Sequence, residues 1–218
     1  MTLAALIVAA GRGIRAGGEL PKQWQMLNGM RVADWTLRTF MNSQMDHIVL
    51  VLPPNDVEVW EIYSAMPGLI LAAGGQDRAT SVLNGLQALK NYNVSKVLIH
   101  DVARPCISPT LIQHVVAALD HGPAAAPAVA VTDALWTGID GRVTGTRNRN
   151  GLFAAQTPQG FHYDAILAAH LAHRGGAADD VEVARSAGLD VTIVPGDPDN
   201  IKITTPGDFA RAERILGT

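Results

Sequence analysis

Short apolar runs alternate with segments of helical periodicity along most of the chain. Uninterrupted apolar runs of this length are typical of strands that are buried on both faces. The intervening segments place apolar residues at intervals of three and four, as amphipathic helices do. This alternation predicts an α/β fold, a sheet with right-handed crossovers through helices. The predicted strands are 4–8, 47–52, 69–72, 96–100 and 124–131, and the predicted helices are 32–41, 56–65, 80–89 and 110–119.

The alternation stops after Thr132. From Asp133 to Asn150, glycines and an Asp140-Gly141 pair separate short extended pieces, and Asp-Gly is a strong hairpin signal. We interpret this stretch as a protruding β-arm at about 133–150. One core is enough for a chain of 218 residues, so we expect a single domain. The later predicted elements are helices at 163–173, 180–187 and 206–216 and strands at 191–194 and 201–203.

Charge and cysteine content narrow the class of protein. A formal net charge of -3 gives no broad cationic field, so we expect no nucleic-acid partner. A few lysines and arginines can still hold a triphosphate. The only cysteine, Cys106, excludes an internal disulfide and fits a reducing compartment. The apolar run at 3–10 is too short for a signal peptide or a membrane span, so we expect a cytoplasmic protein without a membrane partner.

A glycine-rich loop follows the first predicted strand. It contains Gly11 and Gly13, with Arg15 and Lys22 close behind. Glycines let the backbone approach phosphates, and the two cations add charge. The sequence is neither a Walker motif nor Gly-x-Gly-x-x-Gly, because Ala16 stands at the third glycine position, which disfavours dinucleotide binding. A turn with solvated basic residues is the alternative interpretation.

Two further polar clusters stand at predicted strand ends. Asp101 follows a buried strand, and an acid at that edge of an open α/β sheet can hold a divalent cation against phosphates. The alternative is a structural Asp–Arg pair or a turn. The stretch from Gly74 to Ser81 also follows a strand, and its amides and the Ser81 hydroxyl can recognise a base edge, unless Asp77 simply caps the next helix. Lys202 lies in a short apolar segment, where a lysine usually faces solvent.

The remaining candidates for chemistry are weak. His170 and His173 share one predicted helix without an accompanying carboxylate or cysteine, so we expect surface residues and no metal site. Cys106 lacks an evident histidine partner, and no Gly-x-Ser-x-Gly elbow occurs, which disfavours covalent catalysis. Asp179 and Asp180 are typical of a helix start, with a substrate role as the second interpretation.

Six motifs in order resemble the 2-C-methyl-D-erythritol 4-phosphate cytidylyltransferase family. Each motif is common alone, but six at suitable spacing are specific. They are Ala-Ala-Gly-x-Gly-x-Arg at 9–15, Pro-Lys-Gln at 21–23, Gly-Gly with Arg78 and Ser81 at 74–81, His-Asp-x-Ala-Arg-Pro at 100–105, Thr-Pro-Gln at 157–159 and Asp-Asn-Ile-Lys at 199–202.

The resemblance implies a function and a set of site residues. It implies a Rossmann-like, mostly parallel sheet, a homodimer built through the β-arm, a Mg²⁺ requirement, and transfer of CMP from CTP to 2-C-methyl-D-erythritol 4-phosphate in non-mevalonate isoprenoid synthesis. It places Asp101 at the metal and substrate, and Arg149 in the partner's active site. The implied CTP site is Ala9, Ala10, Gly11, Gly13, Gly75 and Ser81, with Arg15 and Lys22 on the phosphates; Arg104, Arg149, Thr157 and Lys202 are implied around the acceptor or the reacting phosphate.

The chain departs from the family pattern in the arm and just before Asp179 and Asp180. Ala134 and Trp136 stand where the family usually has a threonine and a lysine, and Ala178 replaces another threonine. These variants resemble the form that is fused to a cyclodiphosphate synthase. Because the chain ends at Thr218, we expect either a single-function relative or an excised domain. The rival functions are a ribitol 5-phosphate cytidylyltransferase and a non-catalytic nucleotide-binding protein of the same fold.

Overall fold

The computed structural model describes residues 1–11 and 20–217. A central sheet has the strand order β10-β7-β11-β6-β1-β4-β5, and β12 also pairs with β7. The pairs β6–β1, β1–β4, β4–β5 and β12–β7 are parallel, whereas β10 and β11 run antiparallel to their neighbours. The predicted α/β class with a mostly parallel sheet is confirmed. The sheet strands are β1 (Leu3–Val8), β4 (His47–Leu52), β5 (Leu69–Ala73), β6 (Lys96–Asp101), β7 (Ala124–Ala130), β10 (Phe153–Ala155), β11 (Gln159–His162) and β12 (Val191–Pro195).

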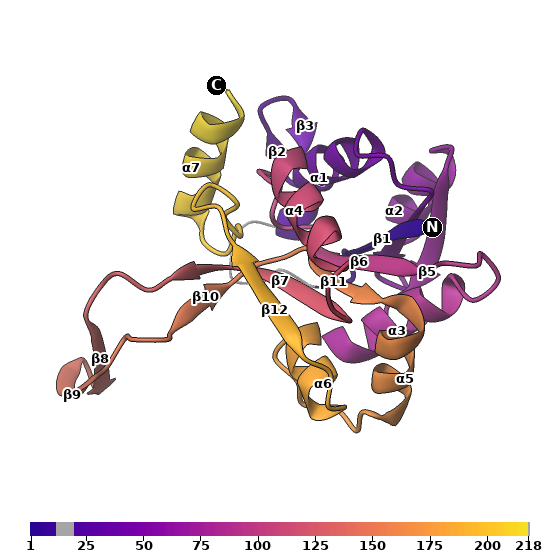
Figure 1. Ribbon diagram of the computed structural model, residues 1–218. Helices are drawn as coiled ribbons and strands as arrows, with labels where there is room; N and C mark the ends of the chain where they lie inside the picture. Colours follow the sequence, from indigo (N-terminus) through magenta and orange to yellow (C-terminus); the bar gives the residue numbers. More distant parts are fainter. Residues whose placement is uncertain (12–19, 218) are drawn as a thin grey trace.

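Helices cover both faces of this sheet, and α1, α2 and α4 lie on the opposite face from α3, α5 and α6 (Figure 1). In the part of the chain that the structure describes, no helix has the length and apolar character needed to cross a membrane. The helices are α1 (Val32–Met41), α2 (Val57–Ser64), α3 (Arg78–Ala88), α4 (Pro109–Ala118), α5 (Tyr163–Ala172), α6 (Asp180–Ser186) and α7 (Pro206–Leu216), with a short 3₁₀ turn η2 (Lys22–Trp24) and the small hairpin β2 (Met26–Leu27) and β3 (Met30–Arg31).

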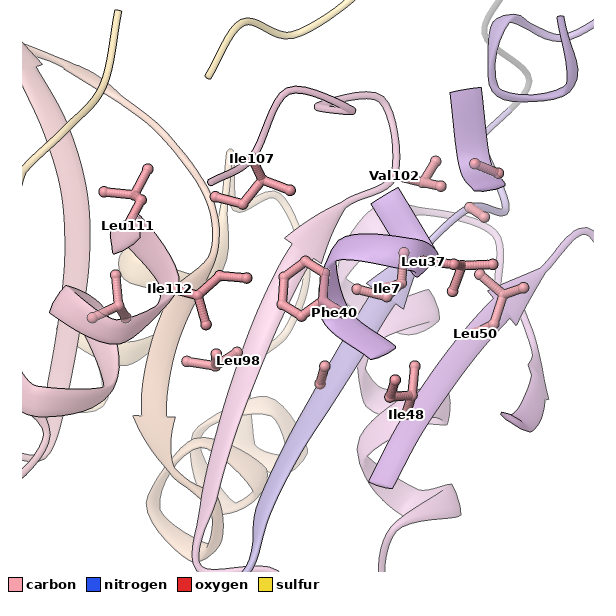
Figure 2. Packing of buried hydrophobic residues seen from close by; sticks show 14 of the residues in the cluster. Ile7, Leu37, Phe40, Ile48, Leu50, Leu98, Val102, Ile107, Leu111 and Ile112 are labelled. Atoms are coloured by element: carbon pink, nitrogen blue, oxygen red, sulfur yellow. The ribbon is translucent and has the colours of Figure 1, made fainter. Parts of the chain in front are cut away.

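The alternation of side chains along β1 builds two separate cores. Ala5 and Ile7 point into the cluster beneath α1, α2 and α4, whereas Ala4 and Leu6 point into the cluster with α3, α5 and α6. Figure 2 shows the first cluster, with Phe40 among the side chains packed over Ile7. Both faces of β1 are therefore buried, and this packing fixes the position of its carboxyl end, where the next loop begins.

Two differences from the predicted elements concern the region next to Asp101. The strand predicted at 201–203 is wrong, since these residues have no assigned strand; Ile203 N donates only to Ala103 O, at 2.8 Å. Strands β10 and β11 were not predicted. β11 lies antiparallel between β6 and β7, and its four residues include Gly160, which weakens a strand pattern.

The segment after Thr132 forms a hairpin of β8 (Leu135–Ile139) and β9 (Arg142–Arg147), and it projects away from the sheet (Figure 1). Asp140 and Gly141 have φ values of 49° and 74°, the left-handed backbone that a tight hairpin turn requires. Trp136 and Ile139 are 68% and 66% exposed. The hairpin therefore carries apolar side chains that the rest of the described chain does not cover.

We expect Gly85→Ala to destabilise the protein, although alanine favours a helix over glycine by about 1 kcal/mol. A Cβ at Gly85, in α3, would lie 2.7 Å from Leu6 Cδ1 and 2.9 Å from Val51 Cγ2, both in a filled core. Overpacking of this kind costs about 1–3 kcal/mol. Urea unfolding measures it, with Gly207→Ala as control, because there the nearest atom is 4.0 Å away. Equal stability changes in both variants would contradict this prediction.

Candidate active site

A cleft of about 1150 Å³ opens at the carboxyl ends of the parallel strands. Its wall includes Gly11 after β1, Gly75 after β5, and Asp101 at the end of β6. Ligands of open α/β sheets lie at this edge, because the loops that follow neighbouring strands meet there. Three of the predicted clusters are thus brought together. Further residues in the wall are Ala9, Ala10, Lys22, Gln23, Arg78, Ser81 and Lys202.

Gln23 fixes the beginning of the glycine-rich loop. Its side-chain amide is buried and donates to the carbonyl oxygens of Ala9, at 2.9 Å, and of Gly11, at 2.5 Å. These bonds keep both carbonyl oxygens directed toward Gln23 and fix the backbone where β1 ends. Gln23 had no predicted role, although its motif with Lys22 was recognised.

Lys22 joins this loop region to the C-terminal part of the chain. Its Nζ donates to the carbonyl oxygen of Ile203, next to Lys202. Both lysines line the large cleft, so two cations from distant parts of the sequence stand at the same wall. The predicted phosphate-binding residues Gly13 and Arg15 lie outside the described residues.

The loop after β5 is built so tightly that it requires both of its glycines. A Cβ on Gly74 would lie 2.2 Å from Ala10 Cβ, and one on Gly75 would lie 2.3 Å from Thr80 Cγ2. Ser81 Oγ accepts from Gly75 N at 3.0 Å and donates to Asp77 O at 2.8 Å. Asp77 caps α3 by accepting from Thr80 N, as the alternative interpretation of this motif predicted. The Gly75 N–H and the Ser81 hydroxyl proton are therefore both used within the loop.

Asp101 carries the negative charge at the centre of the cleft. Its Oδ1 lies 3.3 Å from Arg78 Nε, and its Oδ2 lies 2.6 Å from Lys202 Nζ. Burial alone would raise the pKa of Asp101, but the charges of Arg78 and Lys202 outweigh burial and hold that pKa well below its ordinary value. Asp101 is therefore ionised at neutral pH and orients two cations.

A second, smaller cavity of about 180 Å³ adjoins the large cleft. The two cavities share Arg78, Asp101 and Lys202 in their walls. Two ligands bound side by side would therefore meet at this charged group. The smaller cavity is also lined by Arg104, Gln156, Thr157, Gln159, Ala178 and Asp179.

Thr157 supports Asp101 from β11's side of the sheet. Its Oγ1 accepts from Asp101 N at 3.1 Å and lies 3.1 Å from His100 Nδ1. Burial lowers the pKa of His100 to about 3, so the ring is neutral. Because His100 Nε2 faces the Arg104 carbonyl at 3.3 Å, Nε2 carries the proton and Nδ1 accepts from the Thr157 hydroxyl. Most of the hydrogen-bonding capacity of Thr157 is thus used within the protein.

Arg104 is largely a structural cation. It is 9% exposed, and it donates to the carbonyl oxygens of Asn200, at 2.7 Å, and Ala155, at 3.2 Å. These bonds fasten the segment that carries Lys202 to the end of β10. Arg104 still contributes to the wall of the smaller cavity, which is compatible with its predicted place near the acceptor.

The donor set fits a divalent cation that substrate phosphates help to hold. The residues that the structure describes contain no group of three or more His, Cys, Asp or Glu side chains that could hold a metal, so they form no protein cage. Mg²⁺ typically binds through one or two carboxylates plus substrate phosphates. The ionised Asp101 supplies one carboxylate, and its oxygens have further lone pairs beyond those used by Arg78 and Lys202.

The sequence matches the family model for 2-C-methyl-D-erythritol 4-phosphate cytidylyltransferase over residues 3–218. The chain belongs to this family. The predicted family, one of cytidylyltransferases, is thereby confirmed.

Relatives and solved structures agree with the family assignment. The chain is 68% identical over 216 residues to the bifunctional enzyme IspD/IspF of Ruegeria pomeroyi, covering 99% of the chain and 57% of that protein. It is 58% identical over 217 residues to the 2-C-methyl-D-erythritol 4-phosphate cytidylyltransferase of Roseobacter denitrificans, covering 99% and 97%. The crystal structure of the corresponding Thermus thermophilus enzyme has a TM-score of 0.83 at 30% identity, with full coverage of both chains. The chain thus spans a little over half of its bifunctional relative and covers the IspD part.

One predicted site residue of this cytidylyltransferase family member lies away from the cleft. Arg149 is exposed near the base of the arm, where it donates to the carbonyl oxygen of Thr132. It belongs to the wall of neither cavity. Arg78, by contrast, lines both cavities. It had no predicted role, although it is part of the motif at 74–81.

We expect Thr157→Val to lower both stability and turnover of this family member. The change leaves the partly buried Asp101 N–H and the buried His100 Nδ1 without their partner, which costs about 1–3 kcal/mol. Thr157→Ser keeps the hydroxyl and is the matched control. Thermal unfolding and a pyrophosphate-release assay measure the two effects. If valine and serine behave alike, the hydroxyl does not support Asp101.

Proposed function

We propose that the protein transfers CMP from CTP to 2-C-methyl-D-erythritol 4-phosphate and releases pyrophosphate, in non-mevalonate isoprenoid precursor synthesis. The observation that carries this proposal is the pair of cavities that share Arg78, Asp101 and Lys202. The large cleft suits a nucleoside triphosphate, and the small one suits a polyol phosphate. The product of joining them is 4-diphosphocytidyl-2-C-methyl-D-erythritol.

The reaction needs positioning and charge more than it needs an enzyme nucleophile. A phosphate oxygen of the acceptor attacks the α-phosphorus of CTP, and the bond from that phosphorus to the bridging β-phosphate oxygen breaks in line. The second pKa of a phosphate monoester is about 6, so the acceptor needs no general base at neutral pH. The protein holds two anions together and stabilises the charge that accumulates on the α-phosphoryl oxygens.

We assign this stabilisation to Lys22, Lys202 and Arg15. Lys202 is the best placed of the described cations, because its Nζ stands 2.6 Å from Asp101 Oδ2, where the two ligands would meet. Lys22 lies in the wall of the nucleotide cleft. Asp101 keeps Lys202 directed toward this point and, together with the substrate phosphates, would hold Mg²⁺. A bound Mg²⁺ supplies further neutralisation of phosphate charge.

Hydrogen-bond acceptors in the loop after β5 support cytosine as the base. The Gly75 N–H and the Ser81 hydroxyl proton are both used within the loop, so these two residues offer a base only the Gly75 carbonyl and a Ser81 lone pair. Cytosine presents an amino donor at the position where uracil presents a carbonyl acceptor. A uracil there would leave acceptors facing one another, at a cost of about 1–3 kcal/mol.

We expect pyrophosphate release from CTP with 2-C-methyl-D-erythritol 4-phosphate, and a kcat/KM for UTP at least about 10-fold lower, because unpaired acceptors oppose uracil. A coupled pyrophosphate assay with both nucleotides and a panel of polyol phosphates measures this. Preference for ribitol 5-phosphate would establish the rival reaction instead. Nucleotide binding without pyrophosphate release from any acceptor would point to a non-catalytic protein.

We further propose a homodimer of single nucleotidyltransferase domains, 1–218, joined through the β-arm at 133–150, in the cytoplasm. The exposed Trp136 and Ile139 support the dimer, because a symmetric partner would cover them. Arms that cross would also bring Arg149 of each subunit to the partner's cleft. The buried thiol of Cys106, whose pKa burial raises to about 11, suits a protein without disulfides.

A mixed dimer tests the role of the arm. Lys22→Ala and Arg149→Ala should each lower turnover by about 10² or more, yet subunit exchange between them should restore about half of the wild-type rate per mixed dimer. Only one of the two sites then combines an intact loop with an intact arm. Arg142→Ala, in the same arm, is the control and should stay active. Confirmed exchange without recovered activity would mean that Arg149 does not act across the dimer.

A further inference from the structure

A buried histidine and carboxylate lie behind the smaller cavity. The prediction that His170 is a surface residue is wrong, since it is 4% exposed. Its Nε2 stands 3.2 Å from Oδ1 of Asp180, the wholly buried first residue of α6, although without the alignment of a hydrogen bond. Neither residue lines the large cleft or the smaller cavity.

Asp180 reaches the active site through Arg78. Its Oδ2 accepts from Arg78 Nη2 at 2.7 Å, while Arg78 Nε lies 3.3 Å from Asp101 Oδ1. The guanidinium thus bridges a fully buried carboxylate and the central carboxylate of the cleft. The contact with Asp180 is the shorter of the two, and Asp180 has no access to solvent or ligand that would draw it away.

The surroundings of Asp180 fix it firmly. Gln159 Oε1 accepts from both Asp180 N and Val181 N at 3.1 Å, and Gln159 Nε2 donates to Asp179 Oδ2 at 2.8 Å. Asp179 in turn caps α6 by accepting from Glu182 N. A buried carboxylate is costly unless it is paired and held in place, and here the helix start and β11 hold it opposite Arg78.

Arg78 itself remains open to ligands. Its side chain is 25% exposed and stands in the walls of both cavities. A guanidinium has five N–H donors, and the contacts with Asp180 and Asp101 leave donors over. Its planar fork matches the geometry of a phosphate group.

Building on the function proposed above, we propose that Arg78 binds the phosphate of the acceptor where the two cavities meet, and that Asp180, with His170 behind it, is the residue that positions Arg78. Asp101 alone cannot serve this purpose once it engages substrate or a cation. Asp180 then remains as the anchor that keeps the guanidinium directed toward the acceptor. Asp180 is thus a positioning residue and Arg78 a substrate-binding residue.

Asp180→Asn tests the positioning role, because it keeps the shape and removes the charge. We expect the KM for the polyol phosphate to rise about 10- to 100-fold, while the KM for CTP changes less than about twofold. Asp190→Asn is the matched control, since Asp190 pairs with Arg185 at 3.6 Å on the surface. A purely structural role would lower stability in urea unfolding without this selective rise, and that result would overturn the proposal.

A second variant tests whether Arg78 binds the acceptor, and a double mutant tests whether Asp180 acts through Arg78. Arg78→Gln, at the cleft wall, should raise the acceptor KM at least as much as Asp180→Asn does, and it serves on its own if the Asp180 variant does not fold. An unchanged acceptor KM in Arg78→Gln would refute the binding role. In the Arg78→Gln background, Asp180→Asn should add less than about twofold. Independent, multiplying effects would show that Asp180 does not act through Arg78.

The wild-type protein separates this inference from the proposed function. If it releases no pyrophosphate with CTP and the acceptor, the proposed function fails, and calorimetric titration with inorganic phosphate then tests Arg78 alone. Weaker phosphate binding in Arg78→Gln and Asp180→Asn, but not in Asp190→Asn, would support the anion site. Equal binding in all four proteins would overturn it.

Discussion

The carboxylate of Asp101 organises the charged centre of this molecule. It ends β6, and its two oxygens hold Arg78 from the start of α3 and Lys202 from a segment about one hundred positions further along. Lys202 would not keep a fixed place in the cleft without it, because long basic side chains otherwise remain solvated and mobile, whereas Arg78 is also anchored by Asp180. The low pKa of Asp101 follows from these same partners. The cations thus keep Asp101 ionised, and the ionised Asp101 orients the cations.

The sheet gives Asp101 its fixed position. Residues 3–8 of β1 pair in register with 96–101 of β6, and β11 closes the other edge of β6 through Gln159. Thr157, just before β11, then reaches the amide of Asp101 and the ring of His100. Because β11 runs antiparallel to β6, its beginning lies beside the carboxyl end of β6. Thr157 is thereby placed next to Asp101.

Sequence patterns predicted what depends on local periodicity and on recognisable motifs. The limits of α1 and α7 follow from amphipathic spacing, and the hairpin turn follows from Asp140-Gly141. β11 escaped prediction because four residues with a glycine become a strand only between two neighbours. The placement of His170 failed for the same reason, since its helix has no one-sided apolar pattern to separate the buried face from the exposed one. Long-range packing decides both cases.

The smaller cavity, which the proposed function assigns to the acceptor, has Ala178 at the position of the threonine in the family pattern. Ala178 lines the smaller cavity, and its methyl group offers no hydrogen bond to a polyol. The polar side chains of Thr157 and Gln159 in the same wall are engaged with the protein itself. In the proposed function, what remains for recognition is the charge of the acceptor, which Lys202 and Arg78 would bind. Such a pocket would select a phosphate strongly and the hydroxyl pattern of its carbon chain more weakly. Selectivity among polyol phosphates would then come from the shape of the cavity and, in the proposed dimer, from residues of the second subunit.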